Sequence, residues 1–335
     1  MNAGPSVTAI IPALNASRNI DAVVRAVRSQ TGIPSAPAIV VVDDGSTDDT
    51  AAVARKAGAV VLTQPNRGPA AARNHGWREH GKGELVWFLD ADCFPAPDAL
   101  AILLAALDSP SIGAAGGSYT NARTESALAR IVQAEIAMRH ARMGPEVRFL
   151  GSYHLLVRRE VLESTGGFDE SYRAASGEDN DFSYRIRKLG HRLRFAPGSR
   201  VAHLHPVNVF VYWKEQCRHG EWRMKLYRDH PGEARGDDYS GPFDFLEPPL
   251  ALVTAMAILA APFAWSGEAR VALAAPLLLA TLLALAVPAA WRIGRREGAA
   301  AGLIYMGLRP VRAAARGVGM VRGIARYWFP GGRER

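Results

Sequence analysis

The chain has 335 residues, 48% of them hydrophobic and 21% charged, and this balance excludes a largely disordered protein. Its net charge is +8, but residues 291–335 contain ten arginines and two glutamates, an excess equal to the whole net charge. An excess of basic residues confined to a tail beside apolar segments predicts binding to anionic lipid at a membrane surface, and it argues against nucleic acid as a partner.

The chain begins with a short apolar stretch, Val7–Leu14, that is broken by Pro12 and has no basic residue ahead of it. These features predict a buried strand rather than a signal peptide. The two cysteines, Cys93 and Cys217, belong to no C-x-x-C pair. We therefore expect both to be reduced and structural, as in a cytosolic catalytic protein.

Short β-rich runs alternate with helical patterns from residue 7 to residue 89. This alternation predicts a doubly wound, mostly parallel α/β sheet that binds ligands at the carboxyl ends of its strands. The predicted strands are Val7–Ile11, Ile39–Val42, Val60–Leu62 and Leu85–Leu89, and the predicted helices are Ile20–Gln30, one starting near Thr47, and Ala70–His80.

The next region has a more mixed pattern, which still predicts an α/β domain that ends near residue 215. The predicted elements are a long helix at Glu125–Met143, a strand at Tyr153–Val157, a short helix at Arg159–Ser164, a helix at Asp179–Leu189, and strands at Arg192–Ala196 and Val201–Leu204.

Two uncharged runs follow, Pro248–Trp265 with 18 residues and Val271–Trp291 with 21. A helix that crosses a membrane needs about 20 residues, and a tryptophan ends each run, as aromatic residues do at membrane interfaces. The runs lack the polar face of a packed amphipathic helix, which disfavours the alternative of a buried hairpin in a soluble core. The link Ser266–Arg270 permits only a tight hairpin. Arginines directly after Trp291 predict that both ends of the hairpin face the cytosol.

The basic tail predicts a further helix. Gly298–Leu308 is apolar but too short to span a membrane. At 100° per residue, five later arginines fall within one arc and four apolar residues fall opposite, which predicts an interfacial helix with its arginines toward lipid head groups. The arginines are Arg309, Arg312, Arg316, Arg322 and Arg326, and the apolar residues are Val318, Val321, Ile324 and Trp328.

The strongest chemical signal is Asp90-Ala91-Asp92 at the end of the hydrophobic strand Leu85–Leu89. Two carboxylates at a strand end can share one hard cation, and Mg²⁺ or Mn²⁺ prefers such oxygen ligands while leaving positions for phosphate oxygens. Short acidic pairs also occur in solvated turns, but the strand context favours the metal interpretation.

Two other acidic groups can act both as helix caps and in chemistry. Asp43-Asp44-Gly45-Ser46 follows a strand and precedes a helix, so its carboxylates can accept hydrogen bonds from a nucleotide base or a ribose hydroxyl. Gly177–Asp181 places acids in the first turn of a helix. One positioned carboxylate there could remove the proton of an acceptor hydroxyl.

Other nucleotide-binding patterns fit poorly. No G-x-G-x-x-G follows the first strand. Gly76–Gly83 nearly spells a P-loop, but Gly83 stands where Ser or Thr must hold Mg²⁺, and the segment lies between a helix and a strand in the wrong order.

Taken together, the motifs resemble those of inverting glycosyltransferases of family 2, which have the GT-A fold. The resemblance covers about residues 5–215. The matching segments are Val7–Asn15, Val41–Asp48, Asn66-Arg67-Gly68 with Ala71-Ala72-Arg73-Asn74, Phe88–Asp92, Gly166–Glu170 and Glu178–Asp181.

The resemblance implies a nucleotide-sugar donor, a UDP- or GDP-sugar, and roles for individual residues. Asp179 would be the catalytic base with Glu178 beside it, and Asp90, Asp92 and His203 would bind Mg²⁺ or Mn²⁺, with His205 competing with His203. The residues implied to hold the donor are Pro12, Ala13, Asn15, Asp43, Asp44, Arg73, Asp90 and Ala91.

Processive polysaccharide synthases of this family carry a Gln-x-x-Arg-Trp motif, which Gln216–Trp222 does not match. Transfer of a single sugar with inversion is therefore expected, to an acceptor that membrane attachment suggests is lipid-linked, in the synthesis of a cell-envelope glycan or glycolipid. Two alternatives remain. One is a polyprenyl-phosphate glycosyltransferase, whose acceptor needs no base, and the other is a catalytically inactive subunit that binds nucleotide sugar for assembly.

The sequence thus predicts four regions. Residues 1–215 form the GT-A domain, 216–245 a juxtamembrane segment, 246–291 a transmembrane hairpin, and 292–335 a basic amphipathic tail. The catalytic domain and the tail are expected on the cytosolic side of the membrane.

Overall fold

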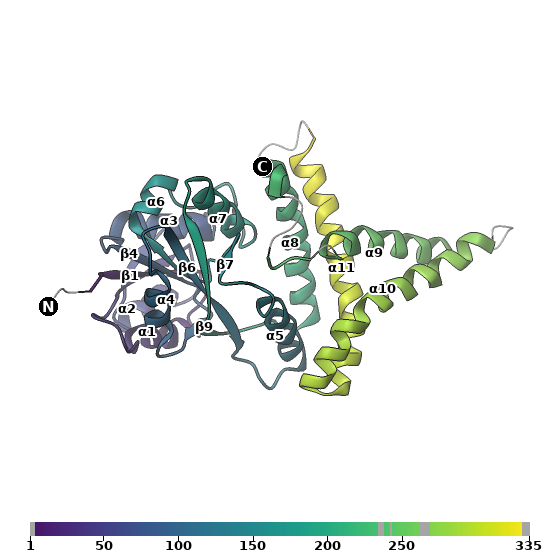
Figure 1. Cartoon of the computed structure of the whole chain (residues 1–335), viewed down its shortest axis with the longest axis horizontal. Coiled ribbons are helices and arrows are strands. Elements are labelled where there is room, and N and C mark those ends of the chain that lie inside the picture. The colour runs from purple at the N-terminus through teal and green to yellow at the C-terminus, as the bar shows by residue number, and fades with distance from the viewer. Residues whose placement is uncertain (1–3, 234–237, 242, 262–268, 330–335) are drawn as a thin grey trace. The chain divides into compact units, whose positions relative to one another are not determined.

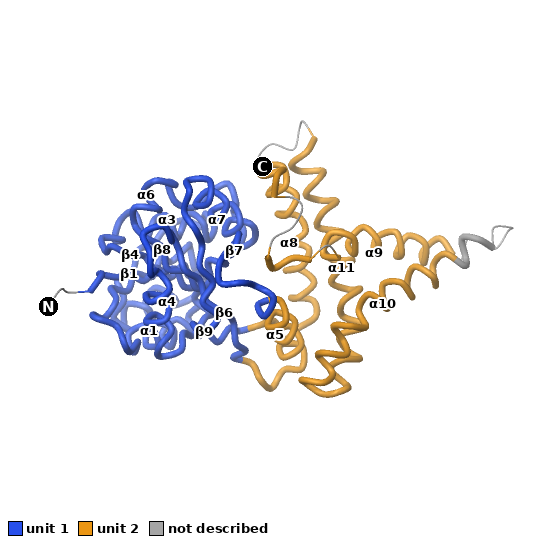
Figure 2. Tube along the Cα trace, viewed as in Figure 1, with its two compact units in different colours: residues 1–122, 140–204 blue, residues 123–139, 205–335 orange. Residues whose placement is uncertain are grey.

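The computed structural model describes residues 4–233, 238–241, 243–261 and 269–329. The chain forms two compact units (Figure 2). The first comprises 1–122 and 140–204, and the second comprises 123–139 and 205–335, as far as these ranges are described. Of the expected hairpin link Ser266–Arg270, residues 266–268 lie outside the described residues, and the last two belong to α10 (Ala269–Glu297).

The first unit is built on one mixed sheet (Figure 1). Its strands lie in the order β3-β2-β1-β4-β8-β6-β9-β5, with β7 also paired to β9. Strands β3, β2, β1 and β4 are parallel to one another, whereas β8 is antiparallel to both β4 and β6. The strands are β1 (Val7–Ala13), β2 (Ala38–Asp43), β3 (Val60–Thr63), β4 (Leu85–Leu89), β5 (Cys93–Pro95), β6 (Ile112–Asn121), β7 (Glu146–Val147), β8 (His154–Arg158) and β9 (Arg192–His203).

Helices cover both faces of this sheet. Alternate residues of β4 point to opposite faces, so that Trp87 packs with Val23 and Leu100 on one side while Phe88 packs with Trp77 and Phe182 on the other. The helices are α1 (Ile20–Arg28), α2 (Thr50–Lys56), α3 (Pro69–His80), α4 (Ala99–Ala106), α6 (Arg159–Thr165) and α7 (Glu178–Lys188).

The predicted α/β fold is confirmed, with differences in its second half. The sheet is parallel only from β3 to β4 and becomes mixed beyond it. The strands expected at Arg192–Ala196 and Val201–Leu204 form one long strand, β9, and the predicted helix Glu125–Met143 is shorter, α5 (Ala127–His140). The pattern did not predict α4, β5, β6 or β7.

The second unit is helical. It contains α5 up to Arg139, α8 (Val209–Asp229), the short helix η1 (Pro231–Glu233), α9 (Phe243–Ala260), α10 (Ala269–Glu297) and α11 (Ala299–Tyr327). Helices α8 and α11 lie side by side, and α9 and α10 form a hairpin (Figure 1). Among the described residues, Phe243–Ala260 and Ala274–Glu297 are long and apolar enough to cross a membrane, and only 22% of each is buried.

The structure corrects the expected orientation of the basic tail. The first three arginines of α11 face carboxylates of the second unit rather than its surface: Arg309 pairs with Glu247, Arg312 with Glu135, and Arg316 with Asp244. Apolar side chains of α11, such as Val321 at 56% and Ile324 at 40%, are exposed instead, as is Trp328 directly after it at 54%. Burial of these guanidinium groups is possible because each has an acidic partner.

Candidate active site

The carboxyl ends of β1 and β2 are joined by hydrogen bonds between their loops. Ala13 at the end of β1 pairs with Asp43 at the end of β2, and Pro12 precedes it on the same strand. The backbone N–H of Asn15 donates to Ser46 Oγ at 2.9 Å. The N–H of Thr47 donates to Asn15 Oδ1 at 2.9 Å. Asn15 has a positive φ of 52°, which turns the chain back over the sheet edge.

The two aspartates after β2 have different surroundings. Asp44 is buried and accepts hydrogen bonds from the side chain of Gln64 and from the N–H groups of Arg67 and Gly68, at 2.7, 2.9 and 2.9 Å. It therefore holds the loop before α3. Asp43 accepts from the N–H of Ser46 at 3.1 Å. Since the oxygens of Asp44 are occupied by that loop, Asp43 is the better placed of the two to contact a nucleotide.

A buried arginine joins the end of β4 to the start of α7. Arg73 is 1% exposed, and its two terminal nitrogens donate to Asp90 Oδ1 at 2.7 Å and to Glu178 Oε1 at 3.0 Å. The charges of Asp90 and Glu178 outweigh the cost of burial and raise the pKa of Arg73. The guanidinium thus fixes the position of α7 relative to the strand that carries Asp90.

The second aspartate of Asp90-Ala91-Asp92 lies beside His203. The Asp92 Oδ2 and His203 Nε2 atoms are 3.3 Å apart, because Cys93 at the start of β5 is the cross-strand neighbour of His203 in β9. Burial alone would raise the pKa of Asp92, but the hydrogen bond and charge of His203 outweigh it and lower the pKa. Ligand atoms of Asp92, Cys93 and His203 all lie within 4.8 Å of one another.

His205 lies in the second unit, where its Nε2 is 2.7 Å from Gln133 Oε1. Of the two histidines considered from the sequence, only His203 lies beside Asp92 in the same unit. Its position at the end of β9 makes it the one that can share a cation with the aspartates.

Asp179 occupies the first turn of α7, directly after the buried Glu178. Its Oδ1 accepts a hydrogen bond from the N–H of Asn180 at 2.8 Å. Burial, followed by the nearby charge of Glu178, raises the pKa of Asp179 to about 7. A carboxylate with this pKa can both accept and release a proton near neutral pH, as a general base requires.

Asn74 joins the motif Ala71-Ala72-Arg73-Asn74 in α3 to the motif Gly166–Glu170. Its side-chain amide donates to the carbonyl of Phe168 at 2.8 Å, and its Oδ1 accepts from the N–H of Phe168 at 2.9 Å. A Cβ on Gly167 would lie 2.3 Å from Asn74 Oδ1, and Gly167 has a φ of +82°, so a side chain there would break this contact. The asparagine of α3 therefore docks the segment that precedes α7.

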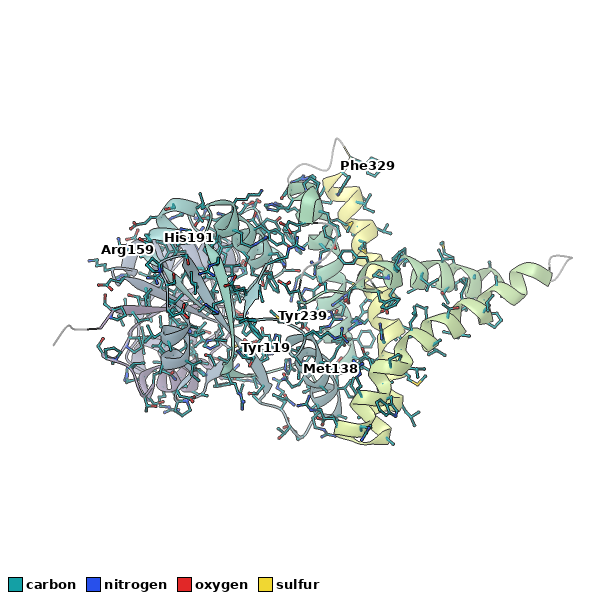
Figure 3. The ribbon with its side chains drawn as sticks, viewed as in Figure 1. Tyr119, Met138, Arg159, His191, Tyr239 and Phe329 are labelled. Atoms are coloured by element: carbon teal, nitrogen blue, oxygen red, sulfur yellow. The ribbon has the colours of Figure 1, made fainter. Side chains whose placement is uncertain are left out.

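An aromatic stack beside His203 was not predicted from the sequence. Tyr119 of β6, labelled in Figure 3, stacks on Tyr153 with ring centroids 3.6 Å apart and lies 4.7 Å from the ring of His203. The hydroxyl of Tyr153 donates to the carbonyl of Gly117 at 2.7 Å, and its carbonyl accepts from the N–H of Asp90 at 3.1 Å. The stack supports both His203 and Asp90. The Gly- and Ala-rich sequence of β6 concealed the strand that supplies Tyr119.

Three features thus meet at the carboxyl end of the sheet. They are the buried aspartates Asp43 and Asp44, the Asp92–His203 pair, and the Asp179 carboxylate with its raised pKa. Asp43, Asp90, Asp92 and Asp179 offer oxygens for a nucleotide, for a cation and for proton removal. Ala91 is half-buried between the two aspartates. This arrangement is suited to binding a nucleotide diphosphate and to activating a hydroxyl group.

Comparisons with known proteins identify the class of protein to which this site belongs. Residues 5–221 match the family model described as "Glycosyltransferase like family 2". The chain belongs to glycosyltransferase family 2, and it is therefore a glycosyltransferase. A solved structure with the same fold is the mannosyltransferase PcManGT from Pyrobaculum calidifontis in complex with GDP-Man and Mn²⁺, with a TM-score of 0.60, 24% identity, and coverage of 94% of this chain and 87% of that one.

Three curated relatives match between 55% and 68% of the chain. Glycosyltransferase AglE of Haloferax volcanii is 29% identical over 67% of this chain and 74% of its own length. Succinoglycan biosynthesis protein ExoU of Rhizobium meliloti is 37% identical over 55% and 58%. Pre-mycofactocin glycosyltransferase of Mycobacterium tuberculosis is 31% identical over 68% and 49%. The chain thus spans only about half of the last two relatives.

Proposed function

We propose that the protein transfers one sugar from a UDP- or GDP-sugar to a lipid-linked acceptor at the cytosolic face of a membrane, with inversion at the anomeric carbon. The observation that carries the proposal is the Asp92–His203 pair at one sheet edge with the bridge from Asp90 through Arg73 to Glu178. This edge combines a site for a diphosphate with a neighbouring carboxylate.

The donor half of the proposal rests on the loops after β1, β2 and β4. Asn15, Asp43 and Asp90 line this end of the sheet, where ligands of doubly wound folds bind. Their oxygens suit the N–H groups of a base and the hydroxyls of a ribose. Pro12, Ala13, Asp44 and Arg73, which are more deeply engaged with the protein, would shape and hold this pocket, with Ala91 beside the diphosphate.

The donor set of Asp90, Asp92 and His203 fits a divalent cation. Asp92 and His203 lie 3.3 Å apart, and carboxylate oxygens are the ligands that Mg²⁺ and Mn²⁺ prefer. A cation bound there would neutralise charge on the leaving diphosphate. The PcManGT structure is a complex of that protein with Mn²⁺ and GDP-Man, which supports the same pair of ligand classes here.

Asp179 is proposed as the base. Its raised pKa, near 7, allows it to take the proton of an acceptor hydroxyl as that oxygen attacks the anomeric carbon and the bond to the diphosphate breaks. One displacement inverts the configuration at that carbon. Glu178, held by Arg73 at 3.0 Å, keeps the start of α7 in place during this step.

The membrane half of the proposal rests on the second unit. Helices α9 and α10 are two mostly exposed apolar helices that form a hairpin, and the last two turns of α10 carry Trp291 and exposed arginines. Such an arrangement suits two membrane spans with both ends on the cytosolic side. The Rhizobium relative is named as a succinoglycan biosynthesis protein, which supports a role in cell-envelope glycan or glycolipid synthesis.

The proposal is tested by incubating the full chain in detergent with a panel of UDP- and GDP-sugars and Mn²⁺. We expect one donor to raise the Tm and to be hydrolysed slowly, and both effects to be lost in Asp92→Asn. Asp98→Asn, at the exposed aspartate that precedes α4, serves as the matched control. The proposal is wrong if no nucleotide sugar raises the Tm of the natural protein. Donor binding without any turnover would favour an inactive assembly subunit.

The raised pKa of Asp179 favours a hydroxyl acceptor over a polyprenyl phosphate. A phosphate is already ionised and needs no base. If Asp179→Asn retained full transfer activity, a phosphate acceptor would become the better interpretation.

A further inference from the structure

The start of α8 exposes a compact run of apolar side chains outside the membrane hairpin. Phe210 is 77% exposed, the highest value among the exposed large hydrophobic residues that the structure describes. Its neighbours Val207, Val209 and Val211 are 51%, 52% and 48% exposed. We call residues 207–211 the apolar segment. Exposed apolar side chains gathered in one place indicate a contact surface rather than chance exposure.

The apolar segment is held in one conformation. The side chain of Asn208 caps α8 by accepting a hydrogen bond from the N–H of Phe210 at 2.7 Å. One turn further, Tyr212 is buried and packs in a cluster with Ala290 and Ile293 of α10. The apolar side chains therefore project from a fixed helix start and not from a flexible loop.

This packing places the start of α8 at the polar end of α10. Trp291 follows Ala290 and is 60% exposed, and the guanidinium of Arg295 lies 4.9 Å from the centre of its ring. Arg292 and Arg296 are exposed on the same end of the helix. A tryptophan with several arginines at the end of an apolar helix marks the depth of the lipid head groups.

We propose that the apolar segment is a third membrane contact, which dips into the cytosolic leaflet at head-group depth beside the hairpin. This inference rests on the proposed membrane hairpin. The leaflet is favoured as the occupant because the segment is continuous with the Trp291 end of α10, and because the exposed arginines there attract anionic lipid.

The chain itself ties this contact to the catalytic edge. Val207 lies four residues after His203, and four extended residues reach at most about 14 Å. Whatever the arrangement of the two units, the first residue of the apolar segment must therefore stay within that distance of the proposed metal-site histidine. A lipid-linked acceptor with its head group at the membrane surface would then meet the active site without leaving the bilayer.

The test measures membrane depth in the full chain, in vesicles of equal parts phosphatidylcholine and phosphatidylglycerol. Three variants each carry one new cysteine, at Phe210, Leu259 or Val60. Leu259 of α9, 72% exposed, is the membrane control. Val60 of β3, 48% exposed, is the control for an exposed apolar position. Each carries a bimane label. The natural Cys93 and Cys217 are buried, and the unsubstituted chain gives their background. The quenchers are phosphatidylcholines brominated near the head group or near the chain end.

We expect the label in Phe210→Cys to lose fluorescence mainly to lipid brominated near the head group. The label in Leu259→Cys should respond most to the deeper quencher, and the label in Val60→Cys to neither. A donor-induced rise in Tm shows that each variant is folded. If position 259 is quenched but 210 responds no more than 60, the inference is wrong while the hairpin stands. If position 259 is not quenched, the membrane part of the proposed function fails as well.

A second copy of the chain could instead cover the apolar segment. Pyrene placed on Phe210→Cys would then show excimer emission that persists as the vesicles are diluted in protein. Persistent excimers would overturn the assignment to lipid, whereas their absence with shallow quenching supports it.

Discussion

Arg73 in α3 and Glu178 in α7 are 105 residues apart in sequence, yet their side chains meet at 3.0 Å in the interior. The same guanidinium donates to Asp90 at 2.7 Å. One side chain therefore couples Asp90, directly after β4, to the helix that presents the proposed base. The resemblance to family 2 implied that Arg73 would contact the nucleotide, whereas its burial suits the holding of these two carboxylates.

The first prediction concerns this bridge. Arg73→Lys keeps the charge but cannot reach both carboxylates with a planar fork, so we expect kcat to fall much more than the affinity for donor. Arg73→Ala leaves the buried Glu178 without its partner, which typically costs about 3–5 kcal/mol of stability. Donor titration and rate are measured on the same sample. Arg67→Lys, at an exposed pair with Glu170, is the matched control, and equal losses in both lysine variants would contradict the prediction.

The second prediction concerns the cation. His203→Ala and Asp92→Asn should each raise the Mn²⁺ concentration needed for half-maximal activity, since the two side chains lie 3.3 Å apart and are proposed to share the cation. His205→Ala should leave that concentration unchanged, because His205 lies beside Gln133 in the second unit. Thermal unfolding of all three variants checks the fold. A shift for His205→Ala equal to that for His203→Ala would reverse the choice between the two histidines.

The third prediction concerns Asp179. Asp179→Asn should lower turnover by about 10²–10⁴-fold, the usual contribution of general-base catalysis, with little change in donor affinity. A large loss of affinity at an unchanged rate would assign Asp179 to binding instead.

The pH dependence of the natural enzyme offers a separate test. The base works when ionised, so kcat/KM should rise with pH and level off above the pKa of about 7. The unfolded-state pKa of Asp is about 3.9, so the folded chain retains a proton that the unfolded chain releases. Stability should therefore decrease as pH rises between these two values. Asp179→Asn should raise the Tm at pH 8 more than at pH 5, and a uniform shift would contradict a raised pKa.

The sequence was sufficient where a local pattern determines the structure. Leu85–Leu89 is continuously apolar and buried, so that the aspartates after it had to lie at the sheet edge. The sequence was insufficient where a side chain or strand contacts a partner that lies far away in the chain. The strand Ile112–Asn121 contains Gly and Ala in place of β-branched residues, so its pattern gave no strand signal. Helical spacing correctly grouped Arg309, Arg312 and Arg316 on one face, but spacing alone does not identify what that face meets.

The fourth prediction follows from that buried face. Arg312 is 4% exposed and is paired with Glu135, and this pair joins α11 to α5. Among the described residues, Arg312→Met leaves Glu135 with Arg139 as its remaining ion-pair partner, at 2.8 Å, and should destabilise the second unit by about 3–5 kcal/mol. Arg322→Met, at an exposed position of the same helix, should change stability by less than about 0.5 kcal/mol. Unfolding in detergent by urea measures both. Equal effects would mean that the pair adds nothing to the stability of the unit.

The last prediction concerns topology. If α9 and α10 both cross the membrane, the link at residues 266–268 is the part of the chain outside the cytosol, and α11 lies at the cytosolic surface. A cysteine replacing Ser266 should then react with an impermeant maleimide added to intact cells. A cysteine replacing Arg322 should react only after the cells are opened. The buried Cys93 and Cys217 should contribute little label in either case. High salt should leave the protein on the membrane, because it screens charges but does not weaken apolar insertion. Detergent should be needed for release. Labelling of position 322 from outside would overturn the topology, and release by salt alone would show that the hairpin is not inserted.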